Sequence, residues 1–435
     1  MLTDPIVALA TPPGRSALAL VRLSGEGAFR VAARVVPTFR SDPPRVARLA
    51  GFLDASGAPI DRGLYAVFPG PASYTGQDLV EFSCHGGLVA PARLIAALQA
   101  AGARPAHAGE FTRRAVLNGK LDLVQAEAVG DLIDATAPAQ ARAALQQLDG
   151  GLSRRLEALR SGLIELQALL GYEVDFPDED DGPVAPERIA GRLAEIGGQI
   201  ERLLATAPAA ERLREGALLV LAGRPNAGKS SLFNALLGTD RALVTEMPGT
   251  TRDAIEAQTD FLGWPVRLVD TAGLGTATDP IDRLGMAMGR RFIAAADLVI
   301  QCVESAEEPG SNSVSALLVR TKCDLVRPTG PGIPVSVVTG EGLELVRRAA
   351  AERIYGDRLQ LADLEPTLTR ARHREALTRA QEALAAVPAQ LGRDGDPVLA
   401  SHHLREATAA LEELIGTVDI EQVLDQVFAS FCVGK

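Results

Sequence analysis

The spacing of hydrophobic residues is strand-like near the N-terminus and becomes helical after Lys120. The stretches "PIVALATPP" and "ALALVRLSG" predict strands, and "GLVAPARLIAALQAAG" predicts a helix that ends at Gly102. Turns rich in glycine and proline lie between these segments. Residues 1–118 are therefore expected to form a mixed α/β domain.

Beyond this domain, leucine and isoleucine recur at steps of three and four, which is the spacing of one helix face. The first stripe consists of Leu145, Leu148, Leu152, Leu156, Leu159 and Leu163. The second stripe consists of Ile189, Leu193, Ile196, Ile200 and Leu203. The acidic stretch "EVDFPDEDDGP" between them is interpreted as a solvated connection between two helices.

A pattern of strand, glycine loop, helix and strand occupies residues 214–357, and helical spacing returns in residues 358–435. The later stripe consists of Leu377, Leu384, Leu404, Leu411, Ile415, Val423 and Val427. The simplest arrangement is a multidomain α/β plus α fold. One helical-bundle domain is then made from residues 119–213 and 358–435, and a second α/β domain is inserted into it.

Composition places the chain among ordinary globular proteins. Its 435 residues predict two or three domains, and 47% hydrophobic with 23% charged residues is typical of a soluble fold. No apolar run reaches the roughly 18–20 residues of a membrane span. The N-terminal "MLTDPIVALATPPGR" lacks the basic start and apolar core of a signal peptide. A cytoplasmic protein without membrane contact is expected.

Charge and cysteine content argue against further classes. A net charge of −11 argues against a protein that coats nucleic acid indiscriminately, although it permits a local basic patch for one RNA. The cysteines contain no CxxC pair, so neither a disulfide framework nor a zinc site is indicated. They are Cys84, Cys302, Cys323 and Cys432.

The stretch "GRPNAGKS", Gly223 to Ser230, follows an apolar strand and opens a helix, which is the context of a phosphate-binding loop. Glycines allow backbone N–H groups to converge on the phosphates, and the helix N-terminus adds partial positive charge. Lys229 is expected to reach the β- and γ-phosphates, and the Ser230 hydroxyl to bind Mg²⁺. This motif alone leaves ATP and GTP open.

Four further motifs follow in the order of a GTPase. "PGTTRD" supplies Thr251 as a second Mg²⁺ hydroxyl, and "VRLVDTAG" ends a strand with Asp270 near the metal. "LLVRTKCD" resembles the N-K-x-D signature, in which the aspartate, here Asp324, accepts from the guanine N1 and N2 hydrogens, and "SVVTGEG" closes over the base. We therefore predict GTP bound to a Ras-like P-loop GTPase domain. The predicted GTP-binding residues are Gly223, Asn226, Ala227, Gly228, Lys229, Ser230, Ser231, Thr245, Thr250, Thr251, Asp270, Thr271, Ala272, Gly273, Thr321, Lys322, Asp324 and Ser336.

Two residues depart from the usual GTPase pattern. Thr321 replaces the asparagine of the guanine signature and is expected to hold the loop less firmly, which affects guanine affinity rather than selectivity. Leu274 follows "DTAG" where Ras-like enzymes carry a glutamine that orients water. Because an apolar side chain cannot orient water, the catalytic polar group must come from elsewhere.

The phosphate loop indicates a substitute. Asn226, followed by "DRALVTEMPGTT", is the arrangement of GTPases activated by potassium. In such enzymes an asparagine and loop carbonyls hold a monovalent cation where an arginine finger would place its charge. Arg224 as a finger in cis is the alternative.

Lysine is rare in this chain. Of 44 lysines and arginines, the lysines are Lys120, Lys229, Lys322 and Lys435. Arginine has been used wherever either cation would serve, so the lysines are expected at sites that need a compact ammonium.

Over its whole length the sequence resembles the MnmE family, also called TrmE, the GTPases of tRNA wobble-uridine modification. The stretches that carry the resemblance are "DPIVALATPPGRSAL", "SYTGQDLVEFSCHGG", "GEFTRRAVLNGKLDLVQAEAVGDLI", "DFPDED", "GRPNAGKSSLFNAL", "GTTRD", "DTAGL" and "FCVGK".

The resemblance implies a homodimer formed through N-terminal domains that bind a tetrahydrofolate derivative, in the 5-formyl or the methylene form. It implies that GTP and potassium bring the two GTPase domains together. With the flavoprotein MnmG, the family installs an aminomethyl-type group on carbon 5 of uridine 34 in certain tRNAs.

Motif matching carries the family's site residues onto this chain. The folate-binding candidates are Arg22, Glu81, Lys120 and Lys435, and the potassium candidates are Asn226, Thr245, Met247 and Thr250. The Mg²⁺ candidates are Ser230 and Thr251. The catalytic candidates are Asp282, Lys229, Thr251 and Cys432. Asp282 stands where the family has a glutamate, so a reduced rate is expected.

The C-terminal "SFCVGK" is an apolar, reactive end where polar, frayed residues are usual. It is expected to fold back into the folate-binding region. Cys432 would then lie near the reacting carbon unit, or it is a small buried hydrophobe; both interpretations stay open.

Four alternatives remain. The chain could be a ribosome-assembly GTPase of the Era or Der type, whose RNA-binding module or second phosphate loop it lacks. The N-terminal domain could serve only dimerisation, with Arg22 and Glu81 paired structurally. The basic stretch "TRARHREALTR" could contact RNA, although a solvated helix face is favoured, and His85 in "SCHGG" is a site residue or a turn histidine.

Overall fold

The computed structural model describes residues 2–175, 186–238, 255–271, 289–305, 316–356, 368–391 and 395–416, together with Leu424, Val427, Phe428, Phe431, Val433 and Gly434. The chain divides into two compact units, residues 1–130 with 412–435, and residues 131–411. Most of the predicted acidic connection and the whole of "DRALVTEMPGTT" lie outside the described residues.

The first unit is built on a six-stranded sheet with the strand order β3-β4-β5-β2-β1-β6. The strands are β1 (Ile6–Leu9), β2 (Leu18–Ser24), β3 (Arg48–Leu53), β4 (Pro59–Phe68), β5 (Leu79–His85) and β6 (Arg104–Pro105). β6 runs parallel to β1, and the other neighbouring pairs are antiparallel. The two strands predicted from "PIVALATPP" and "ALALVRLSG" are confirmed as β1 and β2.

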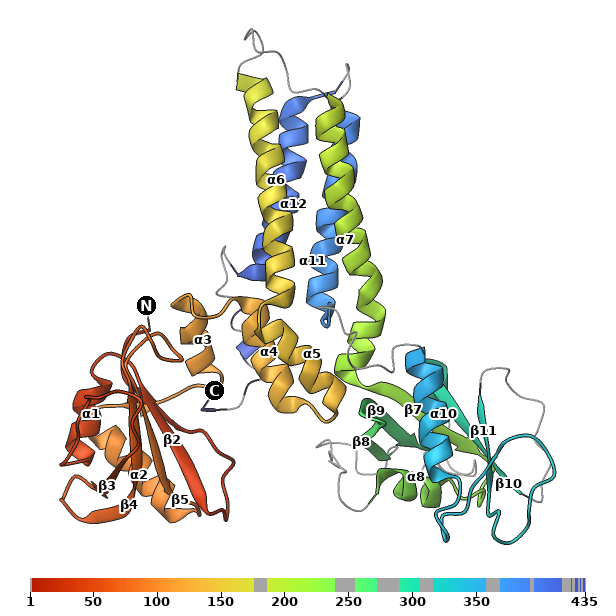
Figure 1. Cartoon of the computed structure of the whole chain (residues 1–435), viewed down its shortest axis with the longest axis horizontal. Coiled ribbons are helices and arrows are strands. Elements are labelled where there is room, and N and C mark those ends of the chain that lie inside the picture. Colours follow the sequence, from red (N-terminus) through yellow and green to blue (C-terminus); the bar gives the residue numbers. More distant parts are fainter. Residues whose placement is uncertain are drawn as a thin grey trace, which may run out of the picture. The chain divides into compact units, whose positions relative to one another are not determined.

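The alternation of side chains along these strands gives the sheet two different faces. One face carries buried residues such as Val21 and Phe82 and is covered by α1 (Ala28–Val35) and α2 (Val89–Ala100) (Figure 1). On the opposite face Arg22 and Glu81 are register partners across β2 and β5. The charged pair therefore lies on the face that the main core does not occupy. α3 (Glu110–Leu117) and α4 (Leu123–Asp134) follow in the sequence.

In the second unit, two helices from residues 151–215 pack together with two helices from residues 371–415. They are α6 (Gly151–Asp175), α7 (Pro186–Glu215), α11 (Ala371–Ala386) and α12 (Pro397–Ile415) (Figure 1). α7 contacts both α6 and α11. The Gln167 amide of α6 donates to the Leu404 carbonyl (3.0 Å) and the Thr408 hydroxyl (2.7 Å) of α12. None of the described helices is long and apolar enough to cross a membrane.

The first leucine stripe, predicted as one helix face, is divided between two helices. α5 (Pro138–Leu148) ends before Gly150, whose φ of +78° breaks the helix, and α6 begins at the next residue. Leu145 is exposed, whereas the members of the stripe on α6 are buried. The prediction was wrong at its start because leucine spacing happens to continue across the break. The second stripe is buried along α7, as predicted.

The second sheet has the order β12-β11-β10-β7-β9-β8. Its strands are β7 (Ala217–Gly223), β8 (Ile255–Phe261), β9 (Trp264–Asp270), β10 (Leu298–Glu304), β11 (Leu317–Thr321) and β12 (Ile333–Pro334). β8 is antiparallel to β9, and the other neighbouring pairs are parallel. α8 (Lys229–Leu237) and α10 (Leu343–Tyr355) pack into one apolar core with these strands. The carboxyl ends of the parallel strands therefore meet at one edge, where ligands of such sheets bind.

Candidate functional site

The phosphate loop connects β7 to α8. Gly223 has a φ of +149°, and a Cβ there would lie 2.3 Å from the Cys302 carbonyl oxygen, so no larger residue fits. Asn226 also adopts a positive φ, of 65°. Lys229 is 7% exposed, and its ammonium donates to the carbonyls of Gly223 (3.0 Å) and Arg224 (2.9 Å). These bonds hold the ammonium against the loop, where a phosphate-binding lysine belongs.

Asp270 lies beside the phosphate loop because β9 is the parallel neighbour of β7. Its register partner is Leu221, and it is 3% exposed. The Thr271 hydroxyl donates to the Leu221 carbonyl at 2.6 Å and fixes the end of β9. Ser230 lies in the first turn of α8. A hydroxyl and a carboxylate at this edge are hard oxygen donors, which suit Mg²⁺.

The predicted guanine loop is tied directly to the phosphate loop. The Thr321 hydroxyl, at the end of β11, donates to the Ala227 carbonyl at 2.9 Å. It therefore reaches the phosphate loop although it is shorter than the asparagine of the usual signature. The Cys323 N–H donates to the Val335 carbonyl (3.2 Å), which joins this turn to the loop of Ser336. The Ser336 hydroxyl accepts hydrogen bonds from the backbone N–H groups of Val338 and Thr339, each at 3.3 Å.

The other residues of this turn are arranged around a strained backbone. Lys322 has a φ of +57°, and its ammonium forms an ion pair with Glu304 of β10. Asp324 follows in the same turn and is exposed. A turn of this kind leaves the Asp324 carboxylate accessible to a base.

Several predicted site residues lie outside the described part of the chain. They are Thr245, Met247, Thr250, Thr251, Ala272, Gly273, Asp282, Cys432 and Lys435. The described part of the predicted nucleotide site therefore consists of the phosphate loop, the end of β9, the turn of Thr321 to Asp324 and the loop of Ser336.

In the first unit, Arg22 and Glu81 form an ion pair that uses only part of their hydrogen-bonding capacity. Arg22 Nε donates to Glu81 Oε1 at 2.8 Å, and the side chains are 17% and 24% exposed. With the residues that the structure describes, neither the two terminal nitrogens of Arg22 nor Glu81 Oε2 forms a hydrogen bond. The Arg22–Glu81 pair can therefore offer N–H donors beside a carboxylate acceptor to a ligand.

The loop of residues 73–77 brings further groups to this pair. The Tyr74 ring lies over Arg22, with 5.6 Å between Arg22 Cζ and the ring centroid. A Cβ on Gly76 would lie 3.3 Å from Lys120 Cγ, so the exposed Lys120 passes beside the same loop. Arg22, which is paired with Glu81, and Lys120 thus both lie beside this loop. The sequence reasoning missed Tyr74, whose only signal is an aromatic residue in the same motif as Glu81.

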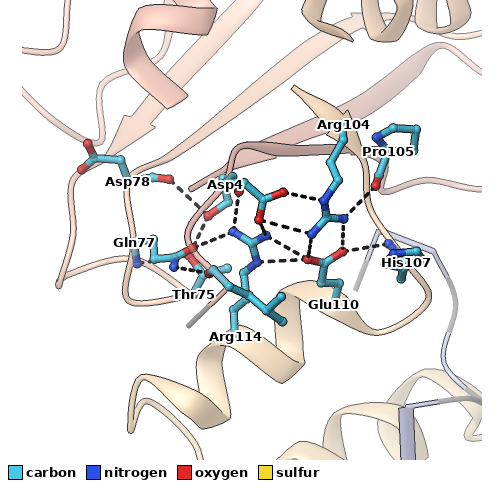
Figure 2. Close-up of polar contacts among 11 residues, drawn as sticks. Asp4, Thr75, Gln77, Asp78, Arg104, Pro105, His107, Glu110 and Arg114 are labelled. Atoms are coloured by element: carbon cyan, nitrogen blue, oxygen red, sulfur yellow. Dashed lines mark hydrogen bonds and ion pairs between the residues drawn. The ribbon is translucent and has the colours of Figure 1, made fainter. Parts of the chain in front are cut away.

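A cluster of four charged residues contacts the same loop through Gln77 (Figure 2). Its members are Asp4, Arg104, Glu110 and Arg114. Arg114 is fully buried and donates to Glu110 (2.8 Å), to the Asp4 carboxylate (3.1 Å) and to the Gln77 amide oxygen (3.0 Å). Both Glu110 oxygens accept hydrogen bonds.

The four-residue cluster controls the ionisation of its carboxylates. Burial would raise the pKa of Glu110, but hydrogen bonds from Arg104, the His107 N–H and Arg114 outweigh it and lower the pKa to about 2. Burial would also raise the pKa of Asp4, but Arg104 and Arg114 outweigh it and lower that pKa. The lowered pKa values keep both carboxylates ionised near neutral pH, and both oxygens of Glu110 accept hydrogen bonds from within the protein.

The described C-terminal residues pack within the first unit: Leu424 and Phe428 against residues of α3 and α4, and Val433 and Gly434 nearer the N-terminal sheet. Val433 forms an antiparallel bridge with Ala108. A Cβ on Gly434 would lie 2.3 Å from the Leu9 carbonyl oxygen at the end of β1. Phe428 and Phe431 pack edge to face, with 5.0 Å between ring centroids.

Two glycines make room for these aromatic rings. A Cβ on Gly109 would lie 2.8 Å from the Phe428 ring, and a Cβ on Gly130 would lie 3.3 Å from the Phe431 ring. Gly434 thus lies beside Leu9 at the end of β1. The neighbour of Leu9, Ala8, is the register partner of Arg22 on β2.

Two open interpretations concerned His85 and the basic stretch of α11. His85 ends β5, and its Nδ1 lies 2.8 Å from Asp61 of β4, whose other oxygen accepts the His85 N–H, so His85 makes a structural contact between neighbouring strands. Burial would raise the pKa of Asp61, and the hydrogen bonds from His85 lower it. Arg370, just before α11, pairs with Asp131, and Arg374 of α11 pairs with Glu211 of α7. These arginines are engaged within the second unit.

Two family models match this chain. The MnmE helical domain matches residues 123–432, and the GTP-binding protein TrmE N-terminus matches residues 5–120.

Curated relatives match along the whole chain. The tRNA modification GTPase MnmE of Akkermansia muciniphila is 39% identical over 450 residues and covers 100% of both chains. That of Thermus thermophilus is 44% identical over 446 residues, covering 100% of this chain and 99% of the relative. That of Maricaulis maris is 43% identical over 443 residues, covering 100% of both.

Among solved structures, the G domain of the FeoB iron transporter of T. maritima is 29% identical, covers 32% of this chain and 98% of that one, and superposes with a TM-score of 0.26. The whole-length relatives include the N-terminal and helical parts, which an Era- or Der-type GTPase would not share. The chain belongs to the MnmE (TrmE) family of tRNA modification GTPases.

Proposed function

We propose that this GTPase, activated by potassium and acting with MnmG, modifies carbon 5 of wobble uridine 34 in tRNA. The group installed is of the aminomethyl or carboxymethylaminomethyl type, and its carbon comes from a tetrahydrofolate derivative in the 5-formyl or methylene form. The working unit is a homodimer formed through the N-terminal domains, each with a folate site of Arg22, Glu81, Lys120 and Lys435. The observation that carries this proposal is that Arg22, paired with Glu81, and Lys120 both lie beside the loop of residues 73–77.

The unused groups of the Arg22–Glu81 pair suit the chemistry of a pterin. The pterin ring has an edge on which an amino group and a ring N–H lie beside a carbonyl oxygen. A carboxylate accepts from the first two, and a guanidinium donates to the third. The glutamate tail carries carboxylates, which the ammonium groups of Lys120 and Lys435 would pair with.

In the nucleotide site, Lys229 holds the phosphate oxygens and Asp324 selects guanine. Ser230 and Thr251 hold Mg²⁺, with Asp270 nearby; when bound, the ion neutralises charge that develops on the phosphates. Potassium is held by Asn226 with Thr245, Met247 and Thr250, and Asp282 orients the attacking water. Lys229, Thr251 and Asp282 form the GTPase catalytic set, and Cys432 is kept as a candidate at the folate site.

The potassium mechanism is tested by GTP hydrolysis in matched potassium and sodium chloride buffers. We expect a potassium-specific rate that Asn226→Ala abolishes. Asn234→Ala, on the exposed side of α8, is the matched control and should keep the wild-type rate. Equal rates in the two salts would contradict the assignment of Asn226 and favour the alternative finger, which Arg224→Ala would then reveal.

A further inference from the structure

Tyr74 lies in the candidate folate site although nothing in the sequence patterns assigned it a role. The centroid of its ring is 5.6 Å from Arg22 Cζ, within the range at which a guanidinium is attracted to an aromatic face. Glu81 holds the same guanidinium through Nε alone. One carboxylate oxygen and one aromatic ring therefore fix the orientation of Arg22.

The position of the Tyr74 ring is itself fixed from several sides. The phenol oxygen is 2.8 Å from the hydroxyl of Thr112, a fully buried residue of α3. The neighbouring Thr75 is also fully buried, with its hydroxyl 2.7 Å from that of Ser24 and its carbonyl accepting from the Asn118 amide (2.7 Å). A loop braced in this way presents the ring with little freedom.

We propose that Tyr74 is a positioning residue of the tetrahydrofolate site, whose ring face orients Arg22 so that its terminal nitrogens point toward the ligand. This inference rests on the proposed folate site. Its physical basis is preorganisation. An arginine held by one hydrogen bond has many rotamers to lose on binding, and a ring against its face removes most of them beforehand.

The ring and the hydroxyl of Tyr74 can be separated experimentally. Tyr74→Phe keeps the ring over Arg22 and loses the bond to Thr112, whereas Tyr74→Leu loses the ring. In the full-length protein, titration of 5-formyltetrahydrofolate by calorimetry should give a Kd roughly tenfold weaker for Tyr74→Leu and close to the wild-type value for Tyr74→Phe. Thr112→Val, which removes only the hydroxyl partner, should resemble Tyr74→Phe.

A double-mutant cycle distinguishes an effect through Arg22 from a general loss of structure. Arg22→Lys keeps the charge and loses the planar guanidinium. If Tyr74 acts through Arg22, then Tyr74→Leu weakens binding much less in the Arg22→Lys background than in the wild type. The thermal unfolding of each variant, followed by calorimetry, serves as the folding control, because Tyr74 and Arg22 lie in the first unit and GTP hydrolysis would report only on the second.

Three results would overturn the inference. They are wild-type affinity of Tyr74→Leu, equal weakening by Tyr74→Phe and Tyr74→Leu, and additive effects in the cycle. A wild-type protein that binds no 5-formyltetrahydrofolate would instead refute the proposed folate site, and the inference with it.

Discussion

The first unit contains two groups of charged residues that use their hydrogen bonds differently. In the four-residue cluster of Asp4, Arg104, Glu110 and Arg114, each Glu110 oxygen accepts from an arginine, and Arg114 is fully buried. In the Arg22–Glu81 pair, one hydrogen bond joins two side chains that are 17% and 24% exposed.

This difference distinguishes structural from functional charge. A charge that is buried without partners is strongly destabilising, so a cluster that only supports the fold is satisfied internally. A half-buried pair keeps contact with solvent and can leave donors and acceptors for a ligand at small cost in stability. We therefore interpret the cluster as the support of the loop of residues 73–77, and the pair as the site.

The largest effect is expected from breaking the cluster. Glu110→Gln leaves Arg114 buried with one charged partner fewer, and should lower the free energy of unfolding by about 3–5 kcal/mol. Glu81→Gln is the matched control and should cost less than about 1 kcal/mol. Calorimetric melting of the full chain measures both. Equal destabilisation by the two variants would end the distinction between cluster and pair.

A smaller effect is expected where the C-terminal segment packs against the start of α3. Gly109 has a φ of +66° and faces the Phe428 ring, whereas Gly119 has the same φ and open space around it. Gly109→Ala should therefore destabilise by about 2–3 kcal/mol, and Gly119→Ala by about 1 kcal/mol. Gly109→Ala alone should also speed hydrogen exchange at Val433, because its bridge to Ala108 is loosened. Unchanged hydrogen exchange at Val433 in Gly109→Ala would mean that the packing of Phe428 on Gly109 does not hold Val433 in place.

The dependence of stability on pH is expected to separate the cluster from the pair most finely. The folded pKa of Glu110 is lowered to about 2, so its stabilising contribution is present above its unfolded pKa and is lost as the pH falls from the ordinary glutamate range toward about 2. The slope from this one group is at most about 1.4 kcal/mol per pH unit. Urea unfolding between pH 5 and 3 should show a shallower acid slope for Glu110→Gln than for the wild type. Identical slopes would show that Glu110 does not carry the effect.

The sequence predicted the strand, loop and helix around the phosphate-loop motif, because these residues are contiguous. "GRPNAGKS" specifies strand, loop and helix within one stretch, and the described residues Gly223, Asn226 and Lys229 adopt the geometry that such a loop needs. The hydrogen bond from the Thr321 hydroxyl to the Ala227 carbonyl could not be predicted from the sequence, because it depends on the distance between two loops in the fold.

The first unit was less accessible to sequence reasoning because its site is assembled by strand register and loop packing. Arg22 and Glu81 are far apart in the sequence and meet only through the pairing of β2 with β5. Their selection came from a family resemblance, and Tyr74 had no periodic signal at all. The wrong prediction of one continuous helix from Leu145 onward has a related cause, since spacing cannot show where a glycine such as Gly150 ends a helix.

The most direct test of the account is the binding of 5-formyltetrahydrofolate to the full-length protein, measured by calorimetry for the wild type, Glu81→Gln and Glu26→Gln. Glu26 is exposed and lies outside both charged groups. We predict that the wild type and Glu26→Gln bind alike, and that Glu81→Gln binds at least roughly tenfold more weakly while its melting temperature stays near the wild-type value. Wild-type affinity of Glu81→Gln would contradict the claim that the Arg22–Glu81 pair is a ligand site and would leave it a structural ion pair.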